Sequence, residues 1–303
     1  MENIIINGKN YILISNYKHD DKLRKSFNAL TQQVYNFDFE KWYNSGYWGE
    51  NCLLYSLLDD DKIVSHITVS VIDFMVLGEK KRFVQLGTVM TDEQYRNQGL
   101  SRVLLEKVLV EWKDHGDMIY LYANDSVLDF YPKFGFVPVD EYQASTTVTP
   151  IQSPYAVRKM DMASDSDRDL LYETAKHSVA LFDITMQNNA GLVMFYSHCF
   201  DLFSVKENLF YIEELNAIAV AEYEENKLIL FDILATETFA IDDVIRALAL
   251  EDTVEAILRF MPINSEKYEV SLFKEEDSTL MVMADNSELF QQNKLIFPML
   301  SHT

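Results

Sequence analysis

One short turn, Arg96-Asn97-Gln98-Gly99-Leu100-Ser101, constrains the fold of this chain more than any other segment. An apolar stretch of extended character, 83–90, precedes it, and apolar residues at helical spacing follow it over 100–112. A strand, a tight turn and a helix start direct unpaired backbone N–H groups and the positive helix end at one point. The sequence therefore predicts an anion site here, with phosphate as its usual occupant.

The composition of the turn favours one kind of phosphate loop over others. Gly99 allows a ligand to approach the backbone closely, and Ser101 is small. No Gly-Lys-Ser/Thr follows the turn, and no Gly-x-Gly-x-x-Gly occurs, so two common nucleotide loops are excluded.

The turn resembles motif A of the GNAT superfamily of acyl-CoA-dependent N-acyltransferases, whose loop reads Gln/Arg-x-x-Gly-x-Gly/Ala. Arg96 and Gly99 match this pattern, and Ser101 replaces its last small residue. In that family the loop binds the pyrophosphate of coenzyme A, and the preceding strand pairs with the pantetheine arm. The resemblance implies acetyl-CoA as the donor, with these residues holding it: Val89, Met90, Thr91, Arg96, Asn97, Gln98, Gly99, Leu100 and Ser101.

A second segment, 130–136, resembles the family ending Tyr-x-x-x-Gly-Phe, although Pro132 departs from the commoner pattern. The resemblance implies that the Tyr131 hydroxyl faces the sulfur and protonates the departing thiolate, which a phenol can do without ionising at neutral pH. The alternative is a tyrosine packed between aromatic neighbours. Asn124 matches a position where the family often contacts the cofactor arm; the alternative is an Asx turn or a helix cap.

No general base is evident. Phe83 and Gln85 occupy the stretch of the motif strand where some family members carry a glutamate. Glu50, His66 and Asp73 could act through a water, but His66 lies in an apolar strand and is better explained as a core histidine.

Composition limits the class of protein. A chain of 303 residues, 48% of them apolar, is long enough for two domains and too apolar for global disorder. The most apolar stretch, 63–77, is interrupted by His66 and Asp73, and the N-terminus does not resemble a signal peptide, so we expect no membrane partner and a cytoplasmic protein. Cys52 and Cys199 fit reduced, buried thiols, and the scattered histidines predict no metal site.

Charge is unevenly distributed along the chain. Residues 1–150 have a net charge of −6 and residues 151–303 a net charge of −16, which together give −22. Nucleic acid is excluded as a partner because its phosphates would be repelled. An acidic surface would concentrate cationic amines, although solubility alone also explains it.

The order of expected elements predicts an α/β fold, a mixed central sheet flanked by helices, for a domain at 1–150. Expected strands are 11–15, 52–58, 63–75, 83–90 and 118–122, with a closing hairpin at 136–148. Expected helices are 20–35, 38–44, 100–115 and 126–133. Pro150 and Pro154 bracket a predicted linker.

Residues 151–303 are predicted to form a second α+β domain that contains only one of the nine glycines, Gly191. After a helix at 164–182, strands are expected at 209–212, 217–223, 227–235, 254–259, 268–273 and 280–284, with a helix at 241–250. The strand at 227–235 followed by the helix at 241–250 has the same order as the strand and helix on either side of the turn at 96–101. The segment between this second strand and helix contains no glycine. A degenerate GNAT-like copy and an unrelated module both fit this order.

The leading hypothesis is an N-acetyltransferase that transfers an acyl group from acetyl-CoA to a primary amine, on a small molecule or a peptide, by direct attack in a ternary complex. The alternatives are a non-catalytic acyl-CoA-binding regulatory module, favoured by the missing base, and an assembly subunit. A homo-oligomer is compatible with the sequence. The apolar end, 297–303, is expected to pack on the protein, with His302 or the terminal carboxylate near the active site.

Overall fold

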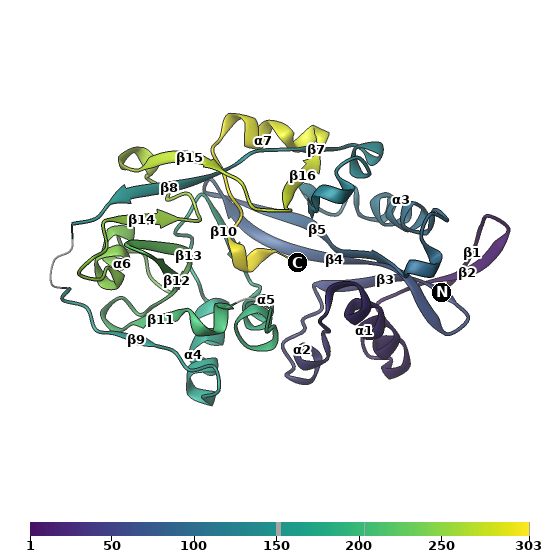
Figure 1. Ribbon diagram of the computed structural model, residues 1–303, viewed down its shortest axis with the longest axis horizontal. Coiled ribbons are helices and arrows are strands. Elements are labelled where there is room, and N and C mark those ends of the chain that lie inside the picture. Colours follow the sequence, from purple (N-terminus) through teal and green to yellow (C-terminus); the bar gives the residue numbers. More distant parts are fainter. Residues whose placement is uncertain (150–152, 203, 303) are drawn as a thin grey trace.

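The computed structural model describes residues 1–149, 153–202 and 204–302. Two β-sheets with their helices make up this part of the chain, one at each end of the elongated molecule in Figure 1. The mixed α/β fold predicted from the sequence is confirmed. The predicted linker at 150–154 falls mostly on 150–152, outside the described residues.

The first sheet has the order β1-β2-β3-β4-β5-β6-β16-β7, and β10 pairs with the far end of β4. Its strands are β1 (Glu2–Ile6), β2 (Lys9–Ser15), β3 (Cys52–Asp59), β4 (Lys62–Val76), β5 (Glu79–Thr91), β6 (Met118–Ala123), β7 (Phe136–Pro138), β10 (Ile184–Gln187) and β16 (Thr279–Met283). β5 and β6 are parallel, and the other pairs are antiparallel.

Helices cover both faces of this sheet. Figure 1 shows α1 (Asp21–Tyr35) and α2 (Glu40–Asn44) on one side of β3–β5 and α3 (Leu100–Trp112) on the other. Asp20 caps the start of α1, since its carboxylate accepts hydrogen bonds from the Lys22 and Leu23 N–H groups, and Asn36 caps its end in the left-handed conformation. Two separate hydrophobic clusters result, one on each face.

The second sheet has the order β15-β8-β14-β13-β12-β11-β9. Its strands are β8 (Glu141–Thr147), β9 (Val157–Lys159), β11 (Leu209–Ile212), β12 (Ala217–Glu224), β13 (Lys227–Ala235), β14 (Glu255–Leu258) and β15 (Glu269–Phe273). The associated helices are α4 (Asp165–Lys176), α5 (Ala190–Met194) and α6 (Ile241–Leu248), while α7 (Ser287–Gln292) follows β16.

Within the second sheet, β13 and β14 are parallel and are joined by α6, as β5 and β6 are joined by α3. An antiparallel strand precedes each unit, β12 in one case and β4 in the other. The two sheets therefore share a local topology.

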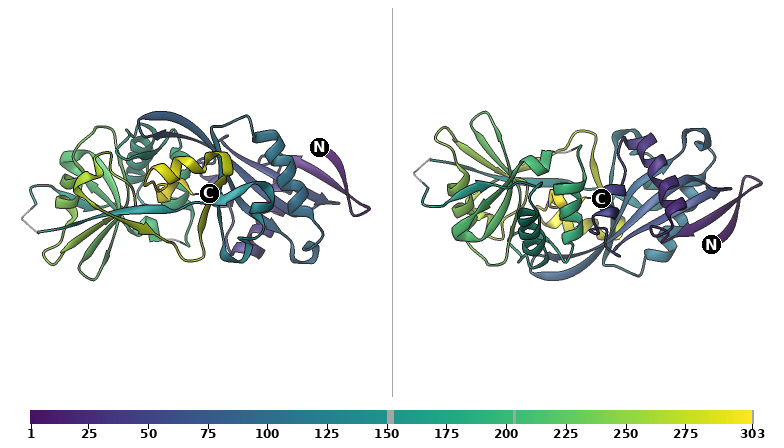
Figure 2. Two further views of the ribbon diagram at one scale, coloured as in Figure 1. Left: turned by 90° about the horizontal axis from the view of Figure 1, so that it is seen from above. Right: turned by 90° about the horizontal axis from the view of Figure 1, so that it is seen from below.

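The predicted closing hairpin at 136–148 is wrong. β7 pairs with β16, and β8 leaves for the second sheet, where it lies between β14 and β15. Strand β16 then returns to fill the gap between β6 and β7. The sheets thus exchange strands across the expected division at residue 150, and both views of Figure 2 show the yellow C-terminal segment between the two ends of the molecule.

The C-terminal segment is part of the first core. Phe297 is 1% exposed and stacks on Tyr120 with ring centroids 4.4 Å apart, while Phe74 and Phe83 contact it edge-on. The expected packing of the apolar end is therefore observed through His302, and Thr303 lies outside the described residues.

We expect Phe297→Ala to lower the free energy of unfolding by about 3–5 kcal/mol, because it removes a fully buried aromatic side chain and leaves a cavity. Urea denaturation followed by circular dichroism measures the change. Ile263→Ala, at a side chain that is 57% exposed, is the control and should cost less than about 0.5 kcal/mol. Equal effects for the two variants would show that the C-terminal segment is not part of the core.

Candidate active site

A cavity of about 680 Å³ opens where β5 and β6 separate. Their parallel pairing ends at Leu86 and Leu121, although both strands continue. Against β4 on the other side, β5 carries a bulge at Thr88 and Val89, and Thr88 has φ of +40°. A bulge leaves backbone N–H and C=O groups outside the hydrogen-bond ladder between two strands. A positive φ at a β-branched residue such as Thr88 is strained. Both features indicate that this segment of β5 contacts something other than a neighbouring strand.

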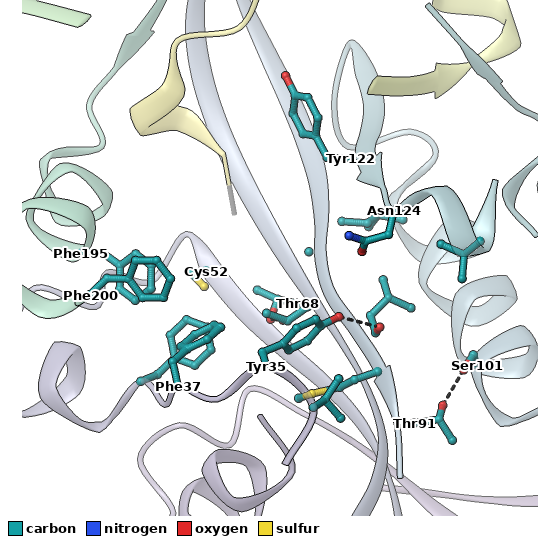
Figure 3. Close-up of a pocket in the computed structure, with 18 of the residues that line it drawn as sticks. Tyr35, Phe37, Cys52, Thr68, Thr91, Ser101, Tyr122, Asn124, Phe195 and Phe200 are labelled. Atoms are coloured by element: carbon teal, nitrogen blue, oxygen red, sulfur yellow. Dashed lines mark hydrogen bonds between the residues drawn. The ribbon is translucent and has the colours of Figure 1, made fainter. Parts of the chain in front are cut away.

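The turn after β5 forms as the sequence predicts. Asn97 and Gly99 adopt left-handed conformations with φ of +61° and +81°, and α3 begins directly after Gly99. The first N–H groups of α3 have no acceptor within the helix, since the first helical bond runs from Val103 N–H to the Gly99 carbonyl. Ser101 Oγ lies 2.6 Å from Thr91 Oγ1, which ties the helix start to the strand end (Figure 3).

The structure brings most of the predicted cofactor residues to one cavity. Its lining includes Val89, Met90, Thr91, Arg96, Ser101, Asn124 and Tyr131. The other four, Asn97, Gln98, Gly99 and Leu100, form the turn and are not among the lining residues; Leu100 is buried beneath it, and Asn7 donates to the Gln98 carbonyl.

Tyr131 lies in the cavity wall on a short 3-10 turn, Tyr131–Phe134, rather than on the predicted helix at 126–133. Its ring contacts Phe130 and Phe136, and burial together with the nearby Tyr35 raises its pKa well above the usual value. The hydroxyl has no hydrogen-bond partner among the described residues. A phenol that stays protonated and faces a cavity can serve as a proton donor.

Asn124 also lines the cavity, but its amide group donates to the carbonyl (3.1 Å) and the carboxylate (3.0 Å) of Asp277, just before β16. It makes no side-chain capping bond to the 3-10 turn that follows it. The side chain therefore connects the cavity rim to a segment from the second half of the chain.

The three candidate bases do not line the cavity. His66 is fully buried, with hydrogen bonds to Ser56 Oγ (2.8 Å) and Thr68 Oγ1 (2.9 Å), and burial lowers its pKa to about 3. Glu50 pairs with Lys18 at 2.8 Å, and Asp73 with Arg82 at 2.7 Å. His66 is thus a core histidine, and the two carboxylates are engaged in ion pairs. No cluster of metal-ligating side chains occurs in the described part of the chain.

Two features of the site were not predicted, the aromatic end of the cavity and the buried acid behind its wall, whereas His302 was expected near the site. Aromatic rings from residues 34–42 and 192–200 line the end of the cavity remote from the turn. Behind the wall, the Tyr122 hydroxyl donates to the buried Glu141 carboxylate (3.0 Å), and the His302 ring stacks on Tyr122 with centroids 4.0 Å apart. Burial lowers the pKa of His302 to about 4. No local pattern signals either feature, because the partners are distant in the sequence.

Comparison with known proteins identifies the domain that supplies most of the lining of this cavity. The family described as Acetyltransferase (GNAT) family matches residues 19–136. This span contains the bulged strand, the turn, α3 and Tyr131. Residues 19–136 form a GNAT domain.

Solved structures extend the likeness in fold beyond the GNAT domain. A probable N-acyltransferase from Enterococcus faecalis V583 aligns with 91% of this chain and 74% of its own, at 13% identity and a TM-score of 0.56. Eis1 from Mycobacterium abscessus aligns over 89% and 73% at 11% identity, with a TM-score of 0.53. A GCN5-related N-acetyltransferase from Anabaena variabilis aligns over 89% and 72% at 10% identity, with a TM-score of 0.54. The fold of most of this chain, including both sheets, is therefore similar to that of these solved structures. No protein with curated function matches the sequence.

Two further findings concern the helices and the cysteines. In the described residues, no helix is long and apolar enough to cross a bilayer. Cys52 and Cys199 are buried free thiols, and Cys52 lines the cavity of the GNAT domain.

Glu141 makes the stability of the protein depend on pH. Burial raises its pKa to about 7, despite hydrogen bonds from Tyr122 and from the Phe297 N–H. Between about pH 4.5 and 7 the folded state keeps a proton that the unfolded state releases, so this group lowers stability as the pH rises. The penalty is complete above pH 7.

We therefore expect Glu141→Gln, which keeps an acceptor oxygen but cannot ionise, to gain roughly 1–3 kcal/mol relative to the wild type between pH 4.5 and pH 8. Urea unfolding at the two pH values measures this difference. Glu276→Gln, at an exposed carboxylate, is the control. If Glu141→Gln kept the pH dependence of the wild type, Glu141 would not be the source of that dependence.

Proposed function

We propose that this chain is an N-acyltransferase that transfers an acetyl or related acyl group from acetyl-CoA to a primary amine in a ternary complex. One observation carries the proposal: the gap between β5 and β6, the helix start at Ser101 and Tyr131 all line a single cavity, most of whose lining belongs to the GNAT domain. A thioester donor needs a polar site for its phosphates, an extended channel and a proton donor near its sulfur.

Each part of the donor has a matching feature. The N–H groups at the start of α3, with the Arg96 guanidinium, suit the pyrophosphate. The bulged segment Gly87–Met90 offers backbone groups to the amides of the pantetheine arm. The N–H groups at Val89 and Met90 are the candidates for polarising the thioester carbonyl.

The chemistry requires few side chains. The amine nitrogen attacks the carbonyl carbon, the C–N bond forms, and the C–S electron pair leaves on sulfur. Tyr131 gives its proton to the sulfur and recovers one from the attacking amine through water. The Tyr35 hydroxyl donates to the Val89 carbonyl (3.0 Å) and holds the bulge in place beside the reacting group.

A non-catalytic acyl-CoA-binding module is the second candidate. It is favoured by one observation, namely that no carboxylate or histidine is found among the described residues that line the cavity. A base is not essential if the amine enters neutral or passes its proton to water, so we rank catalysis first. Acetyl-CoA consumption that depends on an added amine separates the two functions.

We expect Tyr131→Phe to lower kcat by roughly 10²-fold while leaving the Kd for coenzyme A within about twofold, because only the proton donor is lost. Thiol release measures turnover, and calorimetry measures binding. Tyr211→Phe, in the second sheet, is the control and should leave both unchanged. Full turnover by Tyr131→Phe would remove this residue from the mechanism.

Two substitutions of Ser101 that have the same size but differ in charge test the anion site. In Ser101→Glu a carboxylate occupies the position that we assign to phosphate, and we expect the Kd for coenzyme A to rise at least about tenfold. Ser101→Gln introduces a side chain of the same size without the charge and should bind distinctly more tightly than the Glu variant. Equal binding by the two variants would rule out phosphate at this helix end.

A further inference from the structure

The cavity has two chemically different ends. In Figure 3, Thr91 and Ser101 lie on one side, and the rings of Phe37, Phe195 and Phe200 lie together on the other. The polar end is assigned to the donor above. The acyl group would lie between the two ends, beside Val89 and Tyr131, so the aromatic end is where the acceptor must sit.

Four phenylalanines, Phe37, Phe39, Phe195 and Phe200, form what we call the ring wall. Phe195 stacks on Phe200 (5.0 Å between centroids) and on Phe39 (5.4 Å), while Phe37 meets Phe200 edge-on at 4.9 Å. Phe39, Phe195 and Phe200 are 5–7% exposed. The wall is therefore a packed apolar surface, built jointly by the GNAT domain and the segment after α5.

The acidic groups nearest to the ring wall in sequence have other partners. Asp38 accepts from the Glu40 N–H (2.9 Å), Glu40 accepts from Arg24 (3.1 Å), and Asp201 pairs with Lys206 at 2.6 Å. Among the described lining residues, the only charged side chain is that of Arg96, at the donor end. A second ammonium group of the acceptor would thus be buried without a counter-charge, which is unfavourable.

We propose that the acceptor is a primary amine borne on an apolar group of about the size of one aromatic ring, which packs against the ring wall. This inference rests on the function proposed above and names the substrate class of the same site. The overall acidic charge of the chain attracts cations at a distance. The cavity, in contrast, selects the acceptor by its shape and by the free-energy cost of removing it from water.

An apolar acceptor site also helps to explain how the reaction proceeds without a base in the cavity. Transfer of an amine from water to apolar surroundings disfavours its protonated form. The ring wall therefore increases the fraction of acceptor that arrives with a free lone pair. In this way the same surface contributes to both specificity and reactivity.

The test is a competition for acetyl-CoA between 2-phenylethylamine, ethylamine and 1,4-diaminobutane, with the acetylated products measured by mass spectrometry. We expect 2-phenylethylamine to be preferred over each of the others by roughly tenfold or more, since the ring adds apolar contact area. A preference for the diamine would overturn the inference, because aromatic faces can also attract cations.

Substitutions test whether the preference for 2-phenylethylamine depends on the ring wall. Phe37 is only partly buried, so Phe37→Ala is the least disruptive truncation, and we expect it to reduce the phenylethylamine-to-ethylamine product ratio at least about fivefold. A product ratio does not depend on how much of the variant is folded. Phe239→Ala, at a partly buried ring that is not part of the cavity lining, is the control and should keep the ratio. An unchanged ratio in Phe37→Ala would overturn the inference.

Three further outcomes test this inference, and the last two distinguish its failure from the failure of the proposed function. If octanoyl-CoA outcompetes acetyl-CoA with ethylamine, and Phe37→Ala removes that preference, the ring wall holds the donor's acyl chain and the inference is overturned. If coenzyme A binds but 2-phenylethylamine is not acetylated, the inference fails while the donor site remains. If calorimetry detects no binding of coenzyme A, the proposed function fails, and the inference with it.

Discussion

The separation of β5 from β6 is the constraint on which the rest of the site depends. Two parallel strands that stayed paired to their ends would leave no room between Thr88 and Tyr122 and no unpaired backbone to offer. Because pairing stops at Leu86 and Leu121, the bulge on β5 faces open space, and α3 can begin at the mouth of the gap. The cavity is thus a consequence of sheet geometry, and the side chains then set its chemistry.

Strand exchange supports the sheet beside this gap. Beyond the gap, β6 is held by β16, a strand contributed from nearly 160 residues further along the chain, and Phe297 stacks on Tyr120 beneath it. The Asp277 carboxylate, at the start of the same segment, accepts from Asn124 and from the Asp125 N–H (2.7 Å) at the rim. The second half of the chain therefore supports the GNAT domain directly.

Local features of the fold were predictable from the sequence. The strands expected at 52–58 and 63–75, the helix expected at 20–35 and the turn around Gly99 depend on residues that are close in sequence. The predicted hairpin at 136–148 failed because the partners of β7 and β8 lie beyond residue 250. The same limit hid the ring wall, since nothing local relates Phe195 to Phe39 across 156 positions.

The buried acid Glu141 shows how function and stability are linked in this architecture. A carboxyl group with its pKa raised to about 7 destabilises the folded protein at neutral pH, yet it accepts from Tyr122, a residue of the cavity wall, and from the Phe297 N–H of the C-terminal segment. An apolar residue there would avoid the penalty but would leave both donors unpaired, which also costs free energy. Glu141 thus joins the wall of the cavity to the C-terminal segment by hydrogen bonds, beside the ring contacts of His302 with Tyr122 and of Phe297 with Tyr120.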